Sequence, residues 1–400
     1  TAYEISLGLV GSEMCIRDRE DPVAIEDGNG GAFIAWVDYR FDDSGDIFIQ
    51  HVNESGAIQM DPNGIALAQQ QGTQISINMC TDSLGGVYVT WQDKRGGVDD
   101  DIYGTHVDAN YNIISPGSGV PIVVQGGTQS AKSIEYAGNN EAFICWSDSR
   151  QGENIDIYGQ RLDVSMSPLF QENGIPIANS LDPETRPRTT FVNNTTSLVT
   201  WKYGDESARI LYQFVNNSGL VFAEAKPVSN FNAIQSSPRV KRSSDGSVFI
   251  SWKDLRFDPV DGDIFMQKVN PAGDAQWGDG IQIDLTEGVN FSGRFAANSI
   301  GGVDIFWEKG VFPDVDILFQ SLDQNGIPQS NSPIVVSNED GYQFAPNIMK
   351  GSSDSVFVVY ADQGSGSIDL KVSYFKGVSS LVEGGSLLAV KGLDAVSYTH

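Results

Sequence analysis

The chain has 400 residues, 40% of them hydrophobic, and its 25 Lys and Arg residues face 52 Asp and Glu, which gives a formal net charge of −27. The apolar content is sufficient for a large core, whereas the negative charge opposes binding to nucleic acid and to anionic membrane surfaces. No run of about 18 apolar residues occurs, so the sequence predicts no membrane insertion.

The two ends differ in character from the rest of the chain. Residues 1–19 and 393–400 resemble translated sequencing-adapter read-through, so we expect the native part to be 20–392. Within that part only Cys80 and Cys145 remain, too few for a disulfide scaffold. We expect both to be small buried side chains.

The native part begins with a pattern of four strands. Turn residues at 27–31 and 53–56 and an acidic loop at 38–45 separate short apolar runs. The predicted strands are 22–25, 32–36, 47–52 and 65–68. Short connections between such runs predict a four-stranded antiparallel meander.

The second strand of this meander ends in an aromatic residue that returns seven times along the chain. The successive steps are 55, 55, 55, 51, 55 and 53 residues. The seven aromatic residues are Trp36, Trp91, Trp146, Trp201, Trp252, Trp307 and Tyr360. A period near fifty indicates repeated structural units, and seven meanders predict an all-β fold, a seven-bladed β-propeller of four-stranded antiparallel blades.

The third strands, such as DIFIQHV at 46–52, are apolar on both faces. Such strands suit sheets that are covered on both sides, so each meander has to pack between neighbours. We expect the recurrent aromatic residue to lie between adjacent blades. Its loss should cost about 3 to 5 kcal/mol, as for other large buried side chains.

In four copies the aromatic residue opens the pattern W-x-D-x-R. The arginines of these copies are Arg40, Arg95, Arg150 and Arg256. We expect each to pair across its own hairpin with loop aspartates, in exposed pairs worth about 0 to 1 kcal/mol. A weak Ca²⁺ site in the acidic loops is the alternative, although no loop has EF-hand spacing. The sequence therefore predicts no metal site and no cofactor.

The extended pattern, G-G-x-aromatic-Ile-x-W-x-D-x-R followed by D-I-Y/F-x-Q-x-V-D/N-x-x-G, resembles the propeller repeats of secreted bacterial multidomain proteins. Many of those proteins carry a C-terminal sorting domain for type IX secretion. The resemblance covers about residues 20–390, and repeats four, six and seven depart from the motif. It implies a secreted or cell-surface location and a non-catalytic role.

One position of the repeat carries arginine in three successive copies: Arg188, Arg239 and Arg294. The position lies thirteen residues before each aromatic residue and elsewhere is Val23, Asn78, Ser133 or Asn347. In a propeller these arginines would lie near the channel mouth, where guanidinium groups could receive a carboxylate or sulfate. The alternative is that each pairs with an acidic residue of a neighbouring blade. These three are the predicted ligand-binding residues.

The sequence thus predicts a monomeric extracellular binding or scaffold module for an acidic glycan or a protein partner. The alternative is a glycan-active enzyme, a sialidase-like hydrolase or a polysaccharide lyase, acting at the channel mouth. Propeller sialidases bind the carboxylate of their substrate with a comparable set of three arginines. Their S-x-D-x-G-x-T-W motif is absent from this sequence, however, and no catalytic residue can be assigned. His51 and His106 occupy equivalent strand positions, where a polar strand face explains them. A carboxyl group and a Tyr facing the arginines would favour the enzyme.

Overall fold

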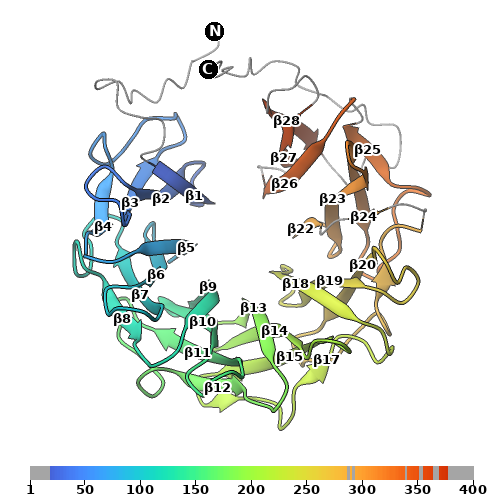
Figure 1. Ribbon diagram of the computed structural model, residues 1–400. Coiled ribbons are helices and arrows are strands. Elements are labelled where there is room, and N and C mark those ends of the chain that lie inside the picture. The colour runs from blue at the N-terminus through green and yellow to red at the C-terminus, as the bar shows by residue number, and fades with distance from the viewer. Residues whose placement is uncertain are drawn as a thin grey trace. The chain divides into compact units, whose positions relative to one another are not determined.

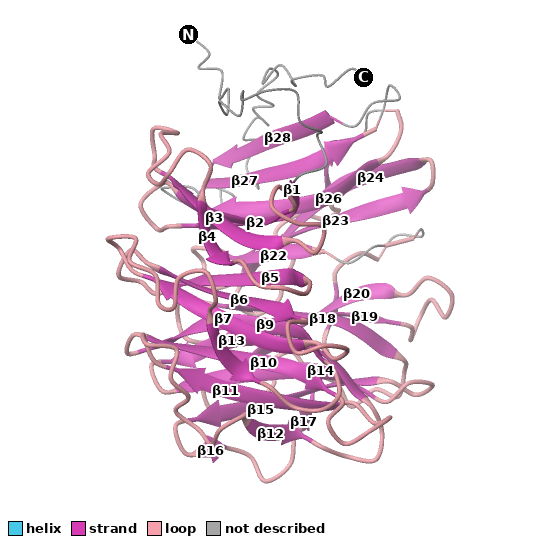
Figure 2. Cartoon of the chain, turned by 60° about the vertical axis from the view of Figure 1, so that its left-hand side comes forward, coloured by secondary structure: helices cyan, strands magenta, loops and turns pink. Residues whose placement is uncertain are grey.

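The computed structural model describes residues 19–285, 289–290, 293–337, 340–350, 355–363 and 369–376. These residues form strands and loops without a helix (Figure 2). Accordingly, none of the described segments is a helix long and apolar enough to cross a membrane. The chain divides into two compact units, 1–201 with 213–225 and 202–212 with 226–400.

The first sheet, which we call blade one, is an antiparallel meander as predicted. Its strands are β1 (Arg19–Glu26), β2 (Ala32–Asp38), β3 (Asp46–Val52) and β4 (Ile65–Ala68), in that order across the sheet. Each contains one of the predicted strands. β1 begins at Arg19, the last residue of the expected foreign segment; residues 1–18, with Cys15, and the expected tail at 393–400 lie outside the described residues.

The same order recurs in the next sheets of the first unit (Figure 1). Blade two has β5 (Gln74–Thr81), β6 (Val87–Asp93), β7 (Asp101–Val107) and β8 (Val120–Val123). Blade three has β9 (Gln129–Gly138), β10 (Glu141–Asp148), β11 (Asp156–Leu162) and β12 (Ile175–Ala178). Blade four, whose residues belong to both units, has β13 (Glu184–Asn193), β14 (Thr196–Tyr203), β15 (Arg209–Asn216), β16 (Gly219–Leu220) and β17 (Lys226–Pro227).

Three further sheets belong to the second unit. Blade five has β18 (Gln235–Arg242), β19 (Val248–Asp254), β20 (Asp263–Val269) and β21 (Ile281–Gln282). Blade six has β22 (Arg294–Ala297), β23 (Val303–Val311), β24 (Asp314–Leu322) and β25 (Ile334–Ser337). Blade seven has β26 (Gln343–Lys350), β27 (Ser355–Asp362) and β28 (Asp369–Lys376) among the described residues.

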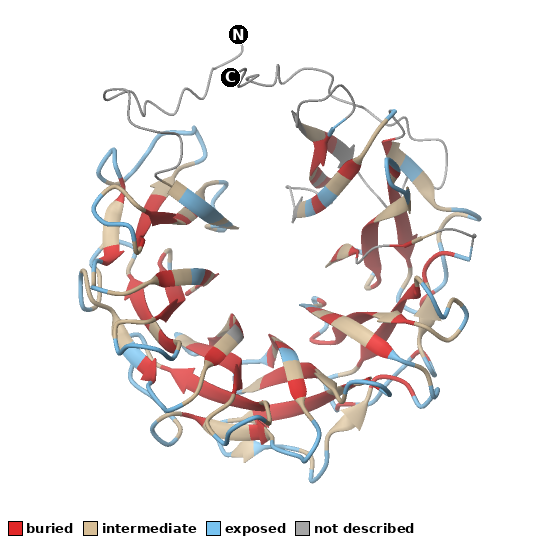
Figure 3. Ribbon diagram, viewed as in Figure 1, coloured by how far each residue is buried: buried red, intermediate tan, exposed pale blue. Residues whose placement is uncertain are grey.

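The predicted fold class, a seven-bladed β-propeller, is confirmed. Two blades vary: in blade four the short strands β16 and β17 both pair with β15, and three strands of blade seven are described. The second and third strands of the blades hold most of the buried residues (Figure 3).

The core lies between neighbouring blades, as apolar residues on both strand faces predicted. In the first unit Trp91 of blade two packs in one cluster with Phe33 and Val37 of blade one. In the second unit Trp307 of blade six packs with Phe249 of blade five, and Tyr360 packs with residues of blade six. In these blades the aromatic residue at the end of the second strand lies against the preceding blade, as expected.

Cys80 and Cys145 are buried free thiols, which confirms their prediction as small core side chains. Trp36, in the first blade of the chain, is only partly buried, whereas the next five tryptophans of the series are at most 1% exposed. The guanidinium of Arg19 lies 5.7 Å from the centre of the Trp36 ring.

Several of the innermost strands have a bulge near their start. In blades one, two, five and seven the pairing with the second strand slips by one residue at this point. The bulges carry residues with positive φ, and blade four has one at the equivalent position: Asp21, Ser76, Arg186, Ser237 and Ala345. A bulge bends the strand and redirects the side chains that follow. The predicted ligand position comes two residues later.

Candidate functional site

In the four complete W-x-D-x-R motifs, the aspartate binds both other members of its own motif. In blade two the Trp91 Nε1 donates to Asp93 Oδ2 at 2.9 Å, and the Arg95 Nη2 donates to the same oxygen at 2.6 Å. The guanidinium carbon of Arg95 lies 3.9 Å from the ring centre of Tyr103 on the third strand. The corresponding aspartates of all four motifs are 0% exposed.

This geometry corrects the prediction for the motif arginines. They do not pair across the hairpin in exposed ion pairs, because each binds the aspartate two residues before it, and that carboxylate is buried. Burial alone would raise the pKa of Asp38, but hydrogen bonds from Arg40 and Trp36 hold it below its ordinary value. The motif therefore has a structural role: its buried aspartate links the tryptophan at the end of the second strand to the arginine in the following loop.

Blades four and six lack the motif aspartate. The hydrogen bonding of their tryptophans shows which contact the aspartate provides in the other blades. The buried Nε1 of Trp201 has no hydrogen-bond partner in the described part of the chain. In blade six the Nε1 of Trp307 donates instead to Asn290 Oδ1 at 3.1 Å. The aspartate therefore satisfies a buried donor that otherwise needs a substitute.

The acidic loops place a second aspartate opposite the first. Asp46 pairs in register with Asp38, and burial, reinforced by the charges of Asp42 and Asp38, raises the pKa of Asp46 to about 6 although a bond from Gln69 opposes this. Within the described ranges no three His, Cys, Asp or Glu side chains are grouped to hold a metal ion. The buried carboxyl group of Asp46 therefore takes up a proton at a higher pH than an ordinary aspartate does.

Arg188, on β13, is half-buried and lacks a carboxylate partner. Its Nη1 donates to the backbone oxygen of Pro187 at 2.9 Å, and among the described residues it forms no ion pair. Burial lowers the pKa of Arg188, and the positive charge of Arg186 adds to this effect against an opposing contribution from Cys145. For Arg188, the alternative of an acidic partner on a neighbouring blade is wrong within the described part of the chain.

Arg239 and Arg294 both lie in the second unit and are half-buried. They occupy equivalent positions on β18 and β22, which pack against each other. Arg188 belongs to the first unit. The convergence of all three arginines at one mouth stays a prediction.

Sequence reasoning missed a carboxyl group beside Arg294. Glu308, the residue after Trp307 on β23, accepts a 2.8 Å hydrogen bond at Oε1 from the backbone N–H of Ala345. Burial raises the pKa of Glu308, against the backbone hydrogen bond and the charge of Arg294, which both lower it. Burial and the charge of Glu308 raise the pKa of Tyr342. One signal was available: Glu308 is the only acidic residue to follow the repeat aromatic.

The histidines have the structural role that their positions predicted. The Nε2 atoms of His51 and His106 lie 2.9 Å from carboxyl oxygens of Asp27 and Asp82, in the turns between the first and second strands. Blade three has the same link between Arg161 and Glu141. These pairs fasten the end of the third strand to the start of the second strand or to the turn before it, at the same end of the blade.

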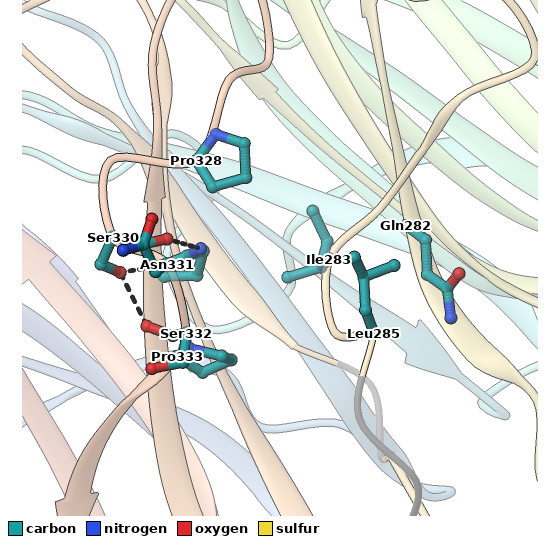
Figure 4. Close-up of a pocket in the computed structure, with 9 residues that line it drawn as sticks. Gln282, Ile283, Leu285, Pro328, Ser330, Asn331, Ser332 and Pro333 are labelled. Atoms are coloured by element: carbon teal, nitrogen blue, oxygen red, sulfur yellow. Dashed lines mark hydrogen bonds between the residues drawn. The ribbon is translucent and has the colours of Figure 1, made fainter.

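A cavity of about 320 Å³ lies between blades five and six (Figure 4). Ile283 and Leu285 lie on one side, and the segment from Pro328 to Pro333 lies on the other. Its lining includes the amide side chains of Gln282, Gln320 and Asn331 but no charged residue. The predicted arginines therefore do not contribute to this cavity.

Neither protein-family models nor curated proteins match this chain. Among solved structures, it is similar to an ulvan lyase, described as a new family of polysaccharide lyase and bound to -[GlcA(1-4)Rha3S]-. That match has a TM-score of 0.55 and 10% identity over 88% of this chain and 91% of the lyase. The β-propeller domain of the Trilobed protease from Pyrococcus furiosus matches with a TM-score of 0.54 and 8% identity, over 96% and 98% of the two chains. At such identities the likeness establishes the fold alone: this chain is a β-propeller.

Proposed function

We propose that this propeller is a non-catalytic extracellular binding module that receives an anionic group, carried by an acidic glycan or by a protein partner. The observation that carries the proposal is Arg188, a half-buried guanidinium without a carboxylate partner among the described residues. The chain has 52 acidic residues against 25 basic ones, so carboxylates are abundant. An arginine kept apart from them is suited to a carboxylate or sulfate from outside.

Arg239 and Arg294 extend the proposal to the second unit. They occupy the same repeat position as Arg188, and Arg239 lies two residues past the bulge position on its innermost strand. Repetition of one guanidinium on successive blades suits a polymer that carries repeated anionic groups. The secreted or cell-surface location and the monomeric state belong to the same proposal, and the location rests on the resemblance of the W-x-D-x-R repeats.

An array of acidic glycans and candidate protein partners, probed with the purified chain, tests the proposal. Arg188→Ala should abolish or strongly weaken binding of the anionic ligand while the melting temperature stays nearly unchanged. Lys94→Ala is the matched control, because it removes the same charge from a 39% exposed side chain in the first unit. Equal binding by both variants, or destabilisation without any ligand, would contradict the proposal.

The second candidate function is a glycan-active enzyme, and Glu308 and Tyr342 favour it. A carboxyl group with a raised pKa is suited to proton transfer, and both residues interact electrostatically within a group that includes Arg294. The test is incubation with acidic polysaccharides, followed by assays for new reducing ends and for unsaturated uronates. Cleavage by the wild type that Glu308→Gln abolishes would replace the binding module with an enzyme.

A further inference from the structure

Blade six differs from the motif-bearing blades in the hairpin between its second and third strands. In blade two the ladder ends where Asp93 pairs with Asp101, and an acidic loop follows. In blade six the ladder continues to the pair Val311 and Asp314. Phe312, at the tip of this longer hairpin, is 73% exposed. The longer ladder thus carries an exposed aromatic ring at its tip, beyond the point where the ladder of blade two ends.

The hairpin is attached to the start of the innermost strand of blade seven. The Val315 N–H donates to the backbone oxygen of Gly341 at 3.2 Å, and Val315 forms a β-bridge with Tyr342. The rings of Phe312 and Tyr342 meet edge to face at 5.7 Å between centroids. Tyr342 stacks on Phe344 at 4.6 Å with an interplanar angle of 12°. The three rings form one aromatic platform, which we define as Phe312, Tyr342 and Phe344.

A carboxyl group, Glu308, lies beside this aromatic platform in the seam between blades six and seven, and Arg294 interacts electrostatically with it. Glu308 is bonded to the N–H of Ala345, the residue after Phe344, and its charge acts on Tyr342. Arg294 acts on Glu308 from β22, which itself packs against β26. Ala345 is exposed and the platform residues Tyr342 and Phe344 are half-buried, so the seam reaches the surface.

We propose that this seam binds a uronic acid residue of an acidic glycan. The C–H face of the sugar ring lies on the aromatic platform, Arg294 receives the sugar carboxylate, and Glu308 hydrogen-bonds a hydroxyl group. The inference rests on the proposed function, because it locates a subsite for the same class of ligand. Polarised C–H bonds favour the negative face of an aromatic ring, and a guanidinium matches a carboxylate in shape and charge.

The polar groups favour a sugar over an apolar peptide. An apolar side chain placed on the platform would remove water from Glu308 and Arg294 without replacing its hydrogen bonds, which is costly. A uronic acid carries both hydroxyl groups and a carboxylate. It can therefore cover the rings and bond the ionisable pair at once.

The test is titration calorimetry with an oligogalacturonate, a chain of 1,4-linked uronic acids, and a neutral cello-oligosaccharide of equal length. Phe312→Ala should weaken oligogalacturonate binding about tenfold, which corresponds to about 1.4 kcal/mol, and Phe312→Trp should retain binding. The matched control is Phe257→Ala, because Phe257 is 66% exposed in the corresponding loop of blade five. Arg294→Ala should weaken oligogalacturonate binding at least as much as Phe312→Ala.

The outcomes separate this subsite from the proposed function. If Arg188→Ala weakens oligogalacturonate binding while Phe312→Ala and Arg294→Ala do not, the subsite is wrong and the binding module stands. If Phe312→Ala and Arg294→Ala weaken it while Arg188→Ala does not, the subsite stands and Arg188 is not part of the anion site. Equal affinity for the neutral oligosaccharide, or for apolar peptides, overturns the assignment to uronic acids. No binding of oligogalacturonate by the wild type overturns the uronic acid subsite, whereas the binding module is overturned only if the array of acidic glycans and protein partners also yields no ligand.

Discussion

The Nε1 of Trp252 donates a 2.8 Å hydrogen bond to Oδ2 of Asp254, two residues further along the chain. The same carboxylate accepts bonds from Arg256 Nη2 at 2.7 Å and from Gln235 Nε2 at 3.1 Å. Asp254 is 0% exposed, and burial, which would raise its pKa, is outweighed by the bonds from Arg256 and Trp252. One buried carboxylate therefore connects the innermost strand, the second strand and the following loop.

Asp254→Asn should destabilise the protein by about 3 to 5 kcal/mol, because removal of one partner leaves the Arg256 guanidinium buried and uncompensated. The midpoint of urea unfolding measures the change. Asp43→Asn removes an exposed loop carboxylate of the same kind in blade one and should have little effect. Equal effects of the two substitutions would show that the buried aspartate contributes no more to the free energy of unfolding than an exposed one.

The outer loops hold the tryptophans in place through glycines. At Gly174, which has a φ of 82°, an added Cβ would lie 2.4 Å from the outer ring carbon of Trp146. At Gly152, with a φ of 107°, no atom lies within 4 Å of such a Cβ. Both substitutions to alanine strain the backbone, so the difference in unfolding free energy isolates the steric clash. We expect Gly174→Ala to cost at least about 1 to 3 kcal/mol more than Gly152→Ala, as in overpacked cores.

The repeat made the blades predictable from sequence, because strand length, turn residues and the recurrent aromatic residue all follow one period. The partners of side chains were less predictable. The W-x-D-x-R spacing does not reveal that Asp93 binds Trp91 as well as Arg95, since that depends on how the chain turns after the strand.

The candidate site was predictable only where it follows the period. Arg188, Arg239 and Arg294 share one repeat position, so sequence alone could select them. Glu308 and Tyr342 lie at different positions of successive repeats, and the hairpin that brings Phe312 to Tyr342 is longer than those of the motif-bearing blades. Contacts between unlike repeat positions on different blades require the structure.

The raised pKa of Asp46 predicts a decrease in stability with rising pH on the acid side. Its pKa is about 6 in the folded chain against 3.8 as the ordinary value, so between these values the folded state binds more protons than the unfolded state. Stability from this group is therefore present below pH 3.8 and is lost as the pH rises through 6. Asp46→Asn should stabilise the protein at pH 7 by roughly 1 to 3 kcal/mol. Urea unfolding at pH 5 and pH 7 checks this; a larger gain at pH 5 would contradict it.

The titration of Lys132 should change the stability of the protein in the opposite direction, and it should do so in a different pH range. It is 4% exposed on β9, where its Nζ donates to the backbone oxygen of Ser76, the bulge residue of blade two. Burial lowers the pKa of Lys132 to about 7 from 10.5, although the charge of Asp100 opposes this. Between these values the unfolded state binds more protons, so stability should rise as the pH increases from 7 towards 10.5. Lys132→Met keeps most of the length of the side chain and removes its charge, and it should stabilise the protein at pH 7 while flattening this part of the pH profile. Lys94→Met, at an exposed position, should leave the slope unchanged. A slope that persists in Lys132→Met would assign the pH dependence to another group.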